Sequence, residues 1–386
     1  FDFATTPQVI VRPGILLRPQ EWLPVGAKRI FIITDPGLLN TGMVNPVADA
    51  LRAHGCEVCV YHEVEADPPE ARVHATVKAA VEAGAEMIIG LGGGSSLDTA
   101  KLVALLTATP QALDSIYGVG LARGPRLPLI QVPTTAGTGS EVTPIAIVTT
   151  PSHEKKGVVS LLLYPDIALL DAELTLGLPP AITAMTGIDA MVHAIEAYTS
   201  KIKKNPLADA LAKESLRLLY ENLPRVLENG RNIEARSAML TGSMMAGMAF
   251  ANAPVAAVHA LAYPLGGHFH VPHGLSNALV LAPVLRYNLS AAERAYAELA
   301  QTLAPARQFS SDNAAATWLI ETLTQLVARM PFAQTLSAVG VTENDLDMLA
   351  SDAMKVERLL INNPRPMTWE AARAIYAEQL GEHHGR

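Results

Sequence analysis

Residues 86–101 of the chain read EMIIGLGGGSSLDTAK, and this stretch decides the fold class. Its apolar first half indicates a buried strand, and the residues from Asp98 onward indicate a helix. Gly92, Gly93 and Gly94 stand at the junction, where glycines let the backbone approach a ligand closely. Because free amides at a helix N-terminus bind anions, we predict a phosphate-binding turn, with a merely tight strand–helix turn as the alternative. The spacing is not the G-x-G-x-x-G fingerprint, so a standard Rossmann domain is not indicated.

Similar patterns of strand and helix alternate through the first half of the chain. Because the predicted strands are apolar throughout, they favour a parallel sheet covered by helices on both faces. We expect strands at 29–34, 57–64, 86–95, 128–135, 145–150, 158–163 and 167–171, with a turn at 35–37 and helices at 45–55, 70–83 and from 98. After Leu178 the pattern becomes helical, which predicts an α/β domain over 1–178 and an all-α domain over 179–386. Helices are expected at 181–200, 206–228, 231–250, 254–263, 275–287, 291–303, 312–328, 344–354 and 368–380.

Composition excludes several classes of protein. Of the 386 residues, 49% are hydrophobic and 17% charged, which predicts large buried cores. A net charge of −8 without a basic run argues against a nucleic-acid partner. We find no apolar stretch near the roughly 20 residues of a membrane span, and no signal-peptide pattern. Cys56 and Cys59 point to opposite faces of a predicted strand, so we read them as reduced thiols of a cytoplasmic protein rather than as a redox or metal pair.

Two further features after predicted strands favour a dinucleotide. The loop PTTAGTGSEVT at 133–143 offers small residues and hydroxyls, among them Thr134, Thr135 and Thr138, which suit a nicotinamide ribose and a pyrophosphate. Asp35 follows the strand at 29–34, where a carboxylate accepts a hydrogen bond from an adenosine ribose and repels a 2′-phosphate. The alternatives are a flexible polar loop and an ordinary turn-starting aspartate before proline.

One acid and several imidazoles stand at intervals typical of a metal site. Asp189 and His193, in GIDAMVHAIEAY at 187–198, are one helical turn apart and share a face. The stretch HALAYPLGGHFHVPHG at 259–274 contributes His259 and His273, and spacing alone leaves His268 and His270 as rivals. One carboxylate with three neutral imidazoles suits Fe(II) or Zn(II). A metal beside a dinucleotide indicates redox chemistry on alcohols and carbonyls.

At these motifs the chain resembles the iron-containing (group III) alcohol dehydrogenase family. The matches are GGGSSLDTAK at 92–101, PTTAGTGSEVT at 133–143, the stretch 178–198 that ends in GIDAMVHAIEAY, HALAYPLGGHFHVPHG at 259–274 and NNPRP at 362–366. They run in order over nearly the whole chain. The resemblance implies a dehydroquinate synthase-like fold, with an α/β nucleotide-binding domain, an all-α metal-binding domain and the active site in the cleft between them.

The resemblance also implies the roles of individual residues. The metal ligands are Asp189, His193, His259 and His273, to the exclusion of His268 and His270. The implied NAD positions are Asp35, Asp67, Gly93, Gly94, Ser95, Asp98, Thr134, Thr135, Thr138, Ile147, Lys156, Leu174, Thr175 and Leu178. One departure concerns Tyr263, which stands where many relatives carry a histidine associated with proton relay or substrate orientation. Because tyrosine has a reference pKa of about 10, it is a poor base at neutral pH.

We therefore expect hydride transfer between NAD(H) and a small alcohol, aldehyde or ketone, with Fe(II), or alternatively Zn(II), acting as a Lewis acid. Phe250, Ile145 and Leu359 are candidate pocket walls. A homodimer is the family-level expectation. Three alternatives stay open: maleylacetate reduction or hydroxyacid–oxoacid transhydrogenation, a lyase like dehydroquinate synthase, and a catalytically silent dinucleotide-binding or assembly protein.

Overall fold

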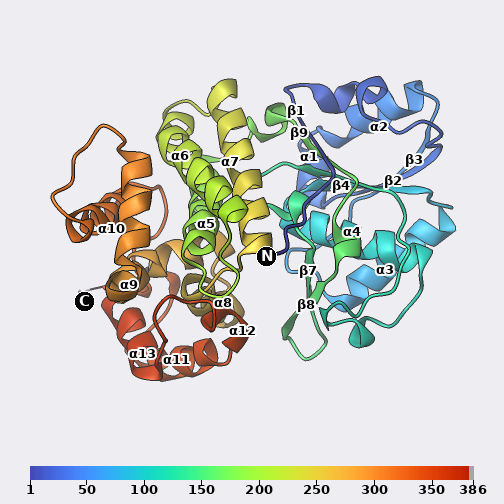
Figure 1. The fold of residues 1–386 in the computed structure, drawn as a ribbon. Helices are drawn as coiled ribbons and strands as arrows, with labels where there is room; N and C mark the ends of the chain where they lie inside the picture. Colours follow the sequence, from blue (N-terminus) through green and yellow to red (C-terminus); the bar gives the residue numbers. More distant parts are fainter. Residues whose placement is uncertain (382–386) are drawn as a thin grey trace. The chain divides into compact units, whose positions relative to one another are not determined.

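The structure, a computed structural model, describes residues 1–381 and divides them into two compact units. The sheet unit comprises Ala4–Gly177 and Arg231–Met244. The helical unit comprises Phe1–Phe3, Leu178–Gly230 and the described residues from Met245 onward. Figure 1 shows the strands gathered in the first unit and the long helices in the second, which confirms the predicted fold class.

The sheet unit is built on a six-stranded sheet in which every pairing is parallel, with the order β1-β9-β6-β4-β2-β3. Its strands are β1 Gln8–Val11, β2 Arg29–Ile33, β3 Glu57–Tyr61, β4 Met87–Gly92, β6 Leu129–Pro133 and β9 Ile167–Leu170. The helices that alternate with them are α1 Pro36–Asn40, α2 Val44–Ala53, α3 Glu70–Glu82 and α4 Gly94–Ala108.

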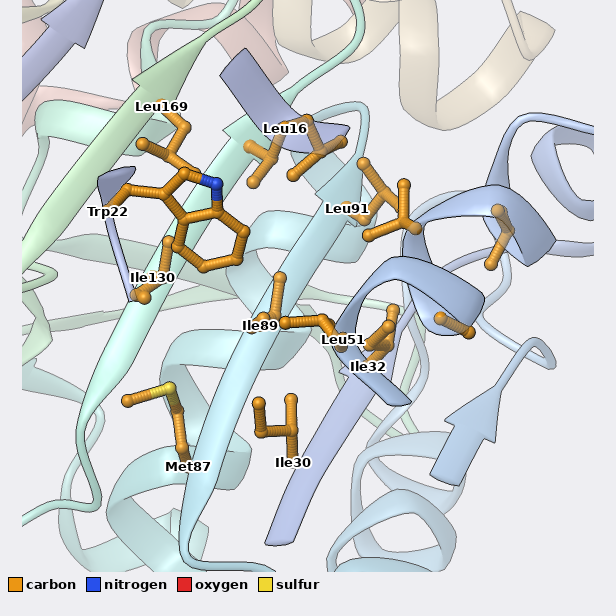
Figure 2. Packing of buried hydrophobic residues seen from close by; sticks show 14 of the residues in the cluster. Leu16, Trp22, Ile30, Ile32, Leu51, Met87, Ile89, Leu91, Ile130 and Leu169 are labelled. Carbon is orange, nitrogen blue, oxygen red and sulfur yellow. The ribbon is translucent and has the colours of Figure 1, made fainter. Parts of the chain in front are cut away.

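Both faces of this sheet are buried, which explains why its strands are apolar throughout. On one face Ile30, Ile32 and Ile89 pack with α2, and Figure 2 shows Trp22 lying on the same side near Ile130. On the other face, the alternate residues of β2 and β4 pack against α3 and α4. This two-sided burial is the arrangement expected of a parallel sheet between helices.

Two predicted strands lie outside the six-stranded sheet. Residues 145–150 form β7 Ile145–Thr149, which pairs antiparallel with β8 Lys155–Val159 in a separate sheet with β5 Gly118–Val119. The strand expected at 158–163 was wrong beyond Val159, because Leu161–Leu163 forms a 3-10 helix. The Ser160 hydroxyl accepts from the Leu162 amide, and this local bond competes with strand pairing.

The helical unit confirms most of the predicted helices. Its elements are α5 Pro180–Thr199, α6 Pro206–Glu228, α7 Ile233–Asn252, α8 Ala257–Phe269, α9 His273–Leu303, α10 Asp312–Ala328, α11 Leu346–Met354, α12 Glu357–Leu360 and α13 Trp369–Glu378, with the first part of α7 grouped with the sheet unit. The break expected between 287 and 291 was wrong, because α9 is continuous. Asn288 is buried there and bonds Asn363 instead of capping a helix.

No single helix in the described part of the chain has both the length and the apolar composition of a membrane span, although α7 and α8 together, bent by 105° at their junction, pass that test.

Candidate metal centre and cofactor site

Asp189, His193, His259 and His273 converge in the helical unit. Asp189 and His193 lie on α5, His259 lies on α8, and His273 is the first residue of α9. The four side chains each offer one ligand atom, and these atoms all lie within 4.8 Å of one another. Three Nε2 atoms surround Asp189 Oδ1, at 3.6 Å for His193, 3.5 Å for His259 and 3.3 Å for His273. Ligands about 2.1 Å from a tetrahedral ion lie about 3.4 Å apart, so the set fits a divalent metal.

The electrostatics of the set also suit a cation. Burial works against the ionised form of Asp189, but the surrounding imidazoles outweigh it and hold the pKa of this carboxyl well below its usual range. Burial lowers the pKa of His259, yet its hydrogen bonds with Asp189 and Glu196 dominate and raise the pKa to about 9. Positive charge is therefore favoured at this place, and a metal would take over the role of the proton.

Ring stacking holds the imidazoles in place. The His193 ring stacks on Phe250, with centroids 4.4 Å apart, and on His259 at 4.8 Å. Phe250, which was expected as a pocket wall, thus contacts the ring of His193 directly. The His273 side chain is 42% exposed whereas the other three residues are buried, so the set is accessible from the side of His273.

Two polar residues around the set were not predicted from the sequence. Asn277, one turn after His273, donates from Nδ2 to Asp189 Oδ1 at 2.7 Å. Glu196, three residues after His193, has Oε1 2.6 Å from His259 Nδ1. Helical spacing from a ligand was the signal that could have revealed both.

The rival histidines lie outside the set. The His268 ring bonds the Asp352 side chain, and His270 ends α8 in the left-handed region with φ 53°. Tyr263 lies on α8 with its ring 6.3 Å from that of His273. Burial raises the pKa of Tyr263, although the positive charge of Arg358 and a hydrogen bond from it oppose this, so the phenol stays protonated at neutral pH.

In the sheet unit, several of the predicted cofactor residues lie where the parallel strands end. Asp35 follows β2, Gly93 follows β4, Thr134 follows β6, and Leu174 lies in a 3-10 helix with Thr175 shortly after β9. These carboxyl ends share one edge of the sheet, which is where ligands bind in such folds. Leu178 is instead the first residue of its segment of the helical unit.

The glycine turn leaves open amides beside the hydroxyl loop. Helix α4 begins at Gly94, earlier than the predicted Asp98, and its N-cap Gly93 supplies no side-chain acceptor. A Cβ at Gly94 would lie 2.9 Å from Thr138 Cγ2, so the turn and the loop are in close approach. A Cβ at Gly93 would lie 4.0 Å from Thr135. A 15-residue helix with an uncapped start suits a phosphate group.

Asp35 begins a helix, and the turn expected at 35–37 was wrong. Its Oδ1 caps α1 by accepting from the Leu38 amide at 2.9 Å. Its Oδ2 would lie 3.5 Å from a Cβ at Gly92, and so faces the glycine turn. The second carboxylate oxygen of Asp35 thus remains available at the predicted ribose site.

Asp67, at φ 49°, donates a hydrogen bond from its backbone amide to Ser95 Oγ and forms an ion pair with Lys155 through its carboxylate.

The carboxylate of Asp98 is committed within the protein. It accepts from Ser140 Oγ at 2.7 Å and from the Ile147 amide at 3.1 Å. The buried Lys101, which the sequence reasoning overlooked, lies 3.7 Å from Asp98 and donates to Ser140 Oγ, Thr143 Oγ1 and Ile145 O. This network fixes the loop that follows Thr138.

Lys156 lies apart from that network, on β8. Its ammonium is 3.8 Å from a carboxylate oxygen of Glu154 and 5.7 Å from the centre of the Tyr117 ring. A role for Lys156 with a cofactor ribose stays a prediction.

An uncapped helix start at the carboxyl ends of a parallel sheet and a largely buried Asp–His set are the features expected of one class of protein, the metal-dependent oxidoreductases that use a dinucleotide. Comparison with known families agrees. Residues 6–172 match the family described as iron-containing alcohol dehydrogenase, and residues 183–380 match the C-terminal part of the Fe-containing alcohol dehydrogenase family. The chain belongs to the iron-containing alcohol dehydrogenase family.

Individual relatives cover most of the chain. It is 40% identical to Long-chain-alcohol dehydrogenase 1 of Geobacillus thermodenitrificans, over 91% of this chain and 89% of that protein. It is 39% identical to the Sulfoacetaldehyde reductase of Bilophila wadsworthia, over 87% and 88%. The crystal structure of sulfoacetaldehyde reductase from Bifidobacterium kashiwanohense in complex with NAD+ is similar with a TM-score of 0.88 and 27% identity, over 98% of both chains.

Proposed function

We propose that the protein is an NAD-dependent alcohol dehydrogenase of the iron type, which transfers hydride between NAD(H) and a small alcohol, aldehyde or ketone. The observation that carries this proposal is the convergence of three imidazoles on Asp189 Oδ1. The glycine turn at 92–94 and the similarity to a relative solved with NAD+ support the cofactor. Family membership favours iron, with zinc as the alternative for the same donors.

When bound, the metal polarises the substrate oxygen and NAD accepts the hydride. The residues of the chain hold the geometry for this chemistry. Asp189 neutralises only one charge of a dication, so the set keeps positive charge that favours an ionised substrate oxygen. Stacking of Phe250 on His193 excludes water from that side. Tyr263, protonated at neutral pH, orients an oxygen by donating and does not act as the base.

The assignment of single residues is part of the proposal. The ligands are Asp189, His193, His259 and His273, and Tyr263 orients the substrate. NAD contacts are assigned to Asp35, Asp67, Gly93, Gly94, Ser95, Thr134, Thr135, Thr138, Ile147, Lys156, Leu174, Thr175 and Leu178, while Asp98 supports the loop. We also propose a domain division at residue 178 and a cytoplasmic homodimer. Cell fractionation and light scattering test the location and the oligomeric state.

A panel of alcohols and aldehydes, offered with NAD or NADP to iron- and zinc-reconstituted protein, tests the function. We expect NADH to accumulate with small primary alcohols and NADP to be used poorly, because Asp35 repels a 2′-phosphate. Lack of NADH formation with every alcohol, on protein that holds its metal, would contradict the proposal.

A second candidate, reduction of an aldehyde that carries an acidic group, is favoured by Arg358. No basic residue is evident within 250–275 apart from histidine, but α12 brings Arg358 to the phenol of Tyr263. One relative is a sulfoacetaldehyde reductase. Arg358→Ala should then raise KM for sulfoacetaldehyde and leave KM for propanal unchanged. Equal effects on both substrates would count against this candidate.

A further inference from the structure

Glu196 is a buried carboxylate, 4% exposed, that meets three donors of another helix. Its Oε1 lies 2.6 Å from His259 Nδ1 and accepts from the His259 backbone amide at 3.3 Å. Its Oε2 accepts from the Val258 backbone amide at 3.1 Å. One side chain of α5 therefore holds both the backbone and the imidazole at the start of α8.

The backbone contacts replace a missing helix cap. The N-cap of α8 is Ala256, whose side chain has no acceptor. The first amides of a helix need partners, and a negative charge near them is favourable. Glu196 supplies both the hydrogen-bond acceptor and the negative charge, although it precedes Val258 by 62 residues in the sequence.

The imidazole contact decides which ring nitrogen faces the ligand set. A carboxylate oxygen accepts the hydrogen bond here, so when a metal replaces one of the two ring hydrogens of His259, the hydrogen that remains must sit on Nδ1. The lone pair is then on Nε2, the atom 3.5 Å from Asp189 Oδ1. The other tautomer would place a lone pair against the Glu196 oxygen at 2.6 Å.

We propose that Glu196 is a positioning residue that holds His259 in its metal-binding tautomer and couples this to the start of α8. The inference rests on the proposed function, since it takes His259 as a ligand. The experiments that test this inference measure metal binding and the protection of backbone amides from hydrogen exchange, rather than enzyme turnover. If Glu196→Ala loses metal affinity as predicted but the wild-type protein oxidises no alcohol, the proposed function is refuted and this inference still holds.

The first experiment compares Glu196→Ala with wild type by Zn(II) competition against a chromophoric chelator and by amide hydrogen exchange. We expect zinc affinity to fall about 10–100-fold, the usual effect of losing such a partner. The Val258 and His259 amides should also exchange faster. Wild-type zinc affinity in Glu196→Ala would overturn the proposal.

The double variant Glu196→Ala/Ala256→Ser separates positioning from structure. Serine at the N-cap restores an acceptor for the first turn of α8 without touching the imidazole. We expect amide protection to recover and zinc affinity to stay low. Recovery of both would show that Glu196 is only a cap. The matched control is Thr199→Val, which removes a hydroxyl bonded to Ile195 O on the same helix. This control should keep wild-type zinc affinity, and an equal loss there would overturn the specific role.

A further test uses the wild-type protein and so does not depend on whether a variant folds. In zinc-loaded protein with 15N-labelled histidine, the NMR shifts of His259 should show a protonated Nδ1 and a metal-bound Nε2. The reverse assignment would overturn the inference.

Discussion

Gly274 lies next to the proposed ligand His273, and its replacement by alanine tests whether helix packing sets the proposed metal site. A Cβ at Gly274 would lie 2.2 Å from the Met185 carbonyl oxygen and 2.6 Å from its carbon, whereas ordinary contact begins at 3.4 Å. Because both contacts are with backbone, α9 and α5 must separate by about 1 Å. Met185 stands one turn before Asp189, so the shift would part His273 from Asp189, whose ligand atoms are now 3.3 Å apart.

Such a displacement exceeds the roughly 0.2 Å tolerance of metal–ligand distances. Misplacement by 1 Å typically costs about 100-fold in rate. We therefore expect Gly274→Ala to lose most of its metal after dialysis and to show a kcat/KM lower by about 100-fold. The assays are metal content by plasma mass spectrometry and NADH absorbance.

Gly267→Ala is the matched control. Gly267 also lies in a helix of this unit, but a Cβ there would meet nothing within 4 Å. Alanine should stabilise α8 by about 0.5–1 kcal/mol and leave the metal content unchanged. Full metal occupancy and wild-type kcat/KM in Gly274→Ala would refute the packing argument.

Three further predictions concern buried polar groups. Asn277→Leu removes the donor to Asp189 Oδ1 and should weaken Zn(II) binding by about tenfold in chelator competition; unchanged affinity would exclude an orienting role. Lys101→Met leaves Asp98 without its buried cation, so the free energy of unfolding in urea should fall by about 3–5 kcal/mol. NAD binding should weaken as well. A loss of stability under 1 kcal/mol would contradict this prediction. Burial raises the pKa of Glu141 to about 7 from 4.5. The folded state therefore binds this proton more tightly, and stability falls by about 3 kcal/mol as pH rises from 4.5 to 7. Glu141→Gln should flatten the urea stability profile over that range, and an unchanged slope would count against it.

Much of the fold could be predicted because most elements carry local signals. The strands β2, β4, β6 and β9 are apolar runs that are buried on both sides, and caps such as Ser311 mark where helices begin. The strand β1 was missed because its four residues gain their partner only from β9, far along the chain. Likewise, nothing near Asn288 reveals that its side chain bonds Asn363 rather than ending a helix.

The proposed metal site was likewise predictable only where its residues lie close together in the sequence. Asp189 and His193 are adjacent on one helix, so spacing alone brought them together. The choice of His273 over His268 depends on where α8 ends and α9 begins, and spacing left that open. Helical spacing places Glu196 near His193 and Asn277 near His273, but their bonding partners, His259 and Asp189, lie on other helices, so the contacts themselves are found only in the folded chain.

We propose that a metal held by Asp189, His193, His259 and His273 is required for alcohol oxidation by NAD. The most direct test titrates metal-free protein with Fe(II) in the presence of NAD and a primary alcohol, while NADH absorbance is recorded. We expect no NADH without metal, a rate that rises to saturation near one ion per chain, and no response in His259→Ala. Wild-type rates in the metal-free protein, or an equal response in His259→Ala, would contradict it.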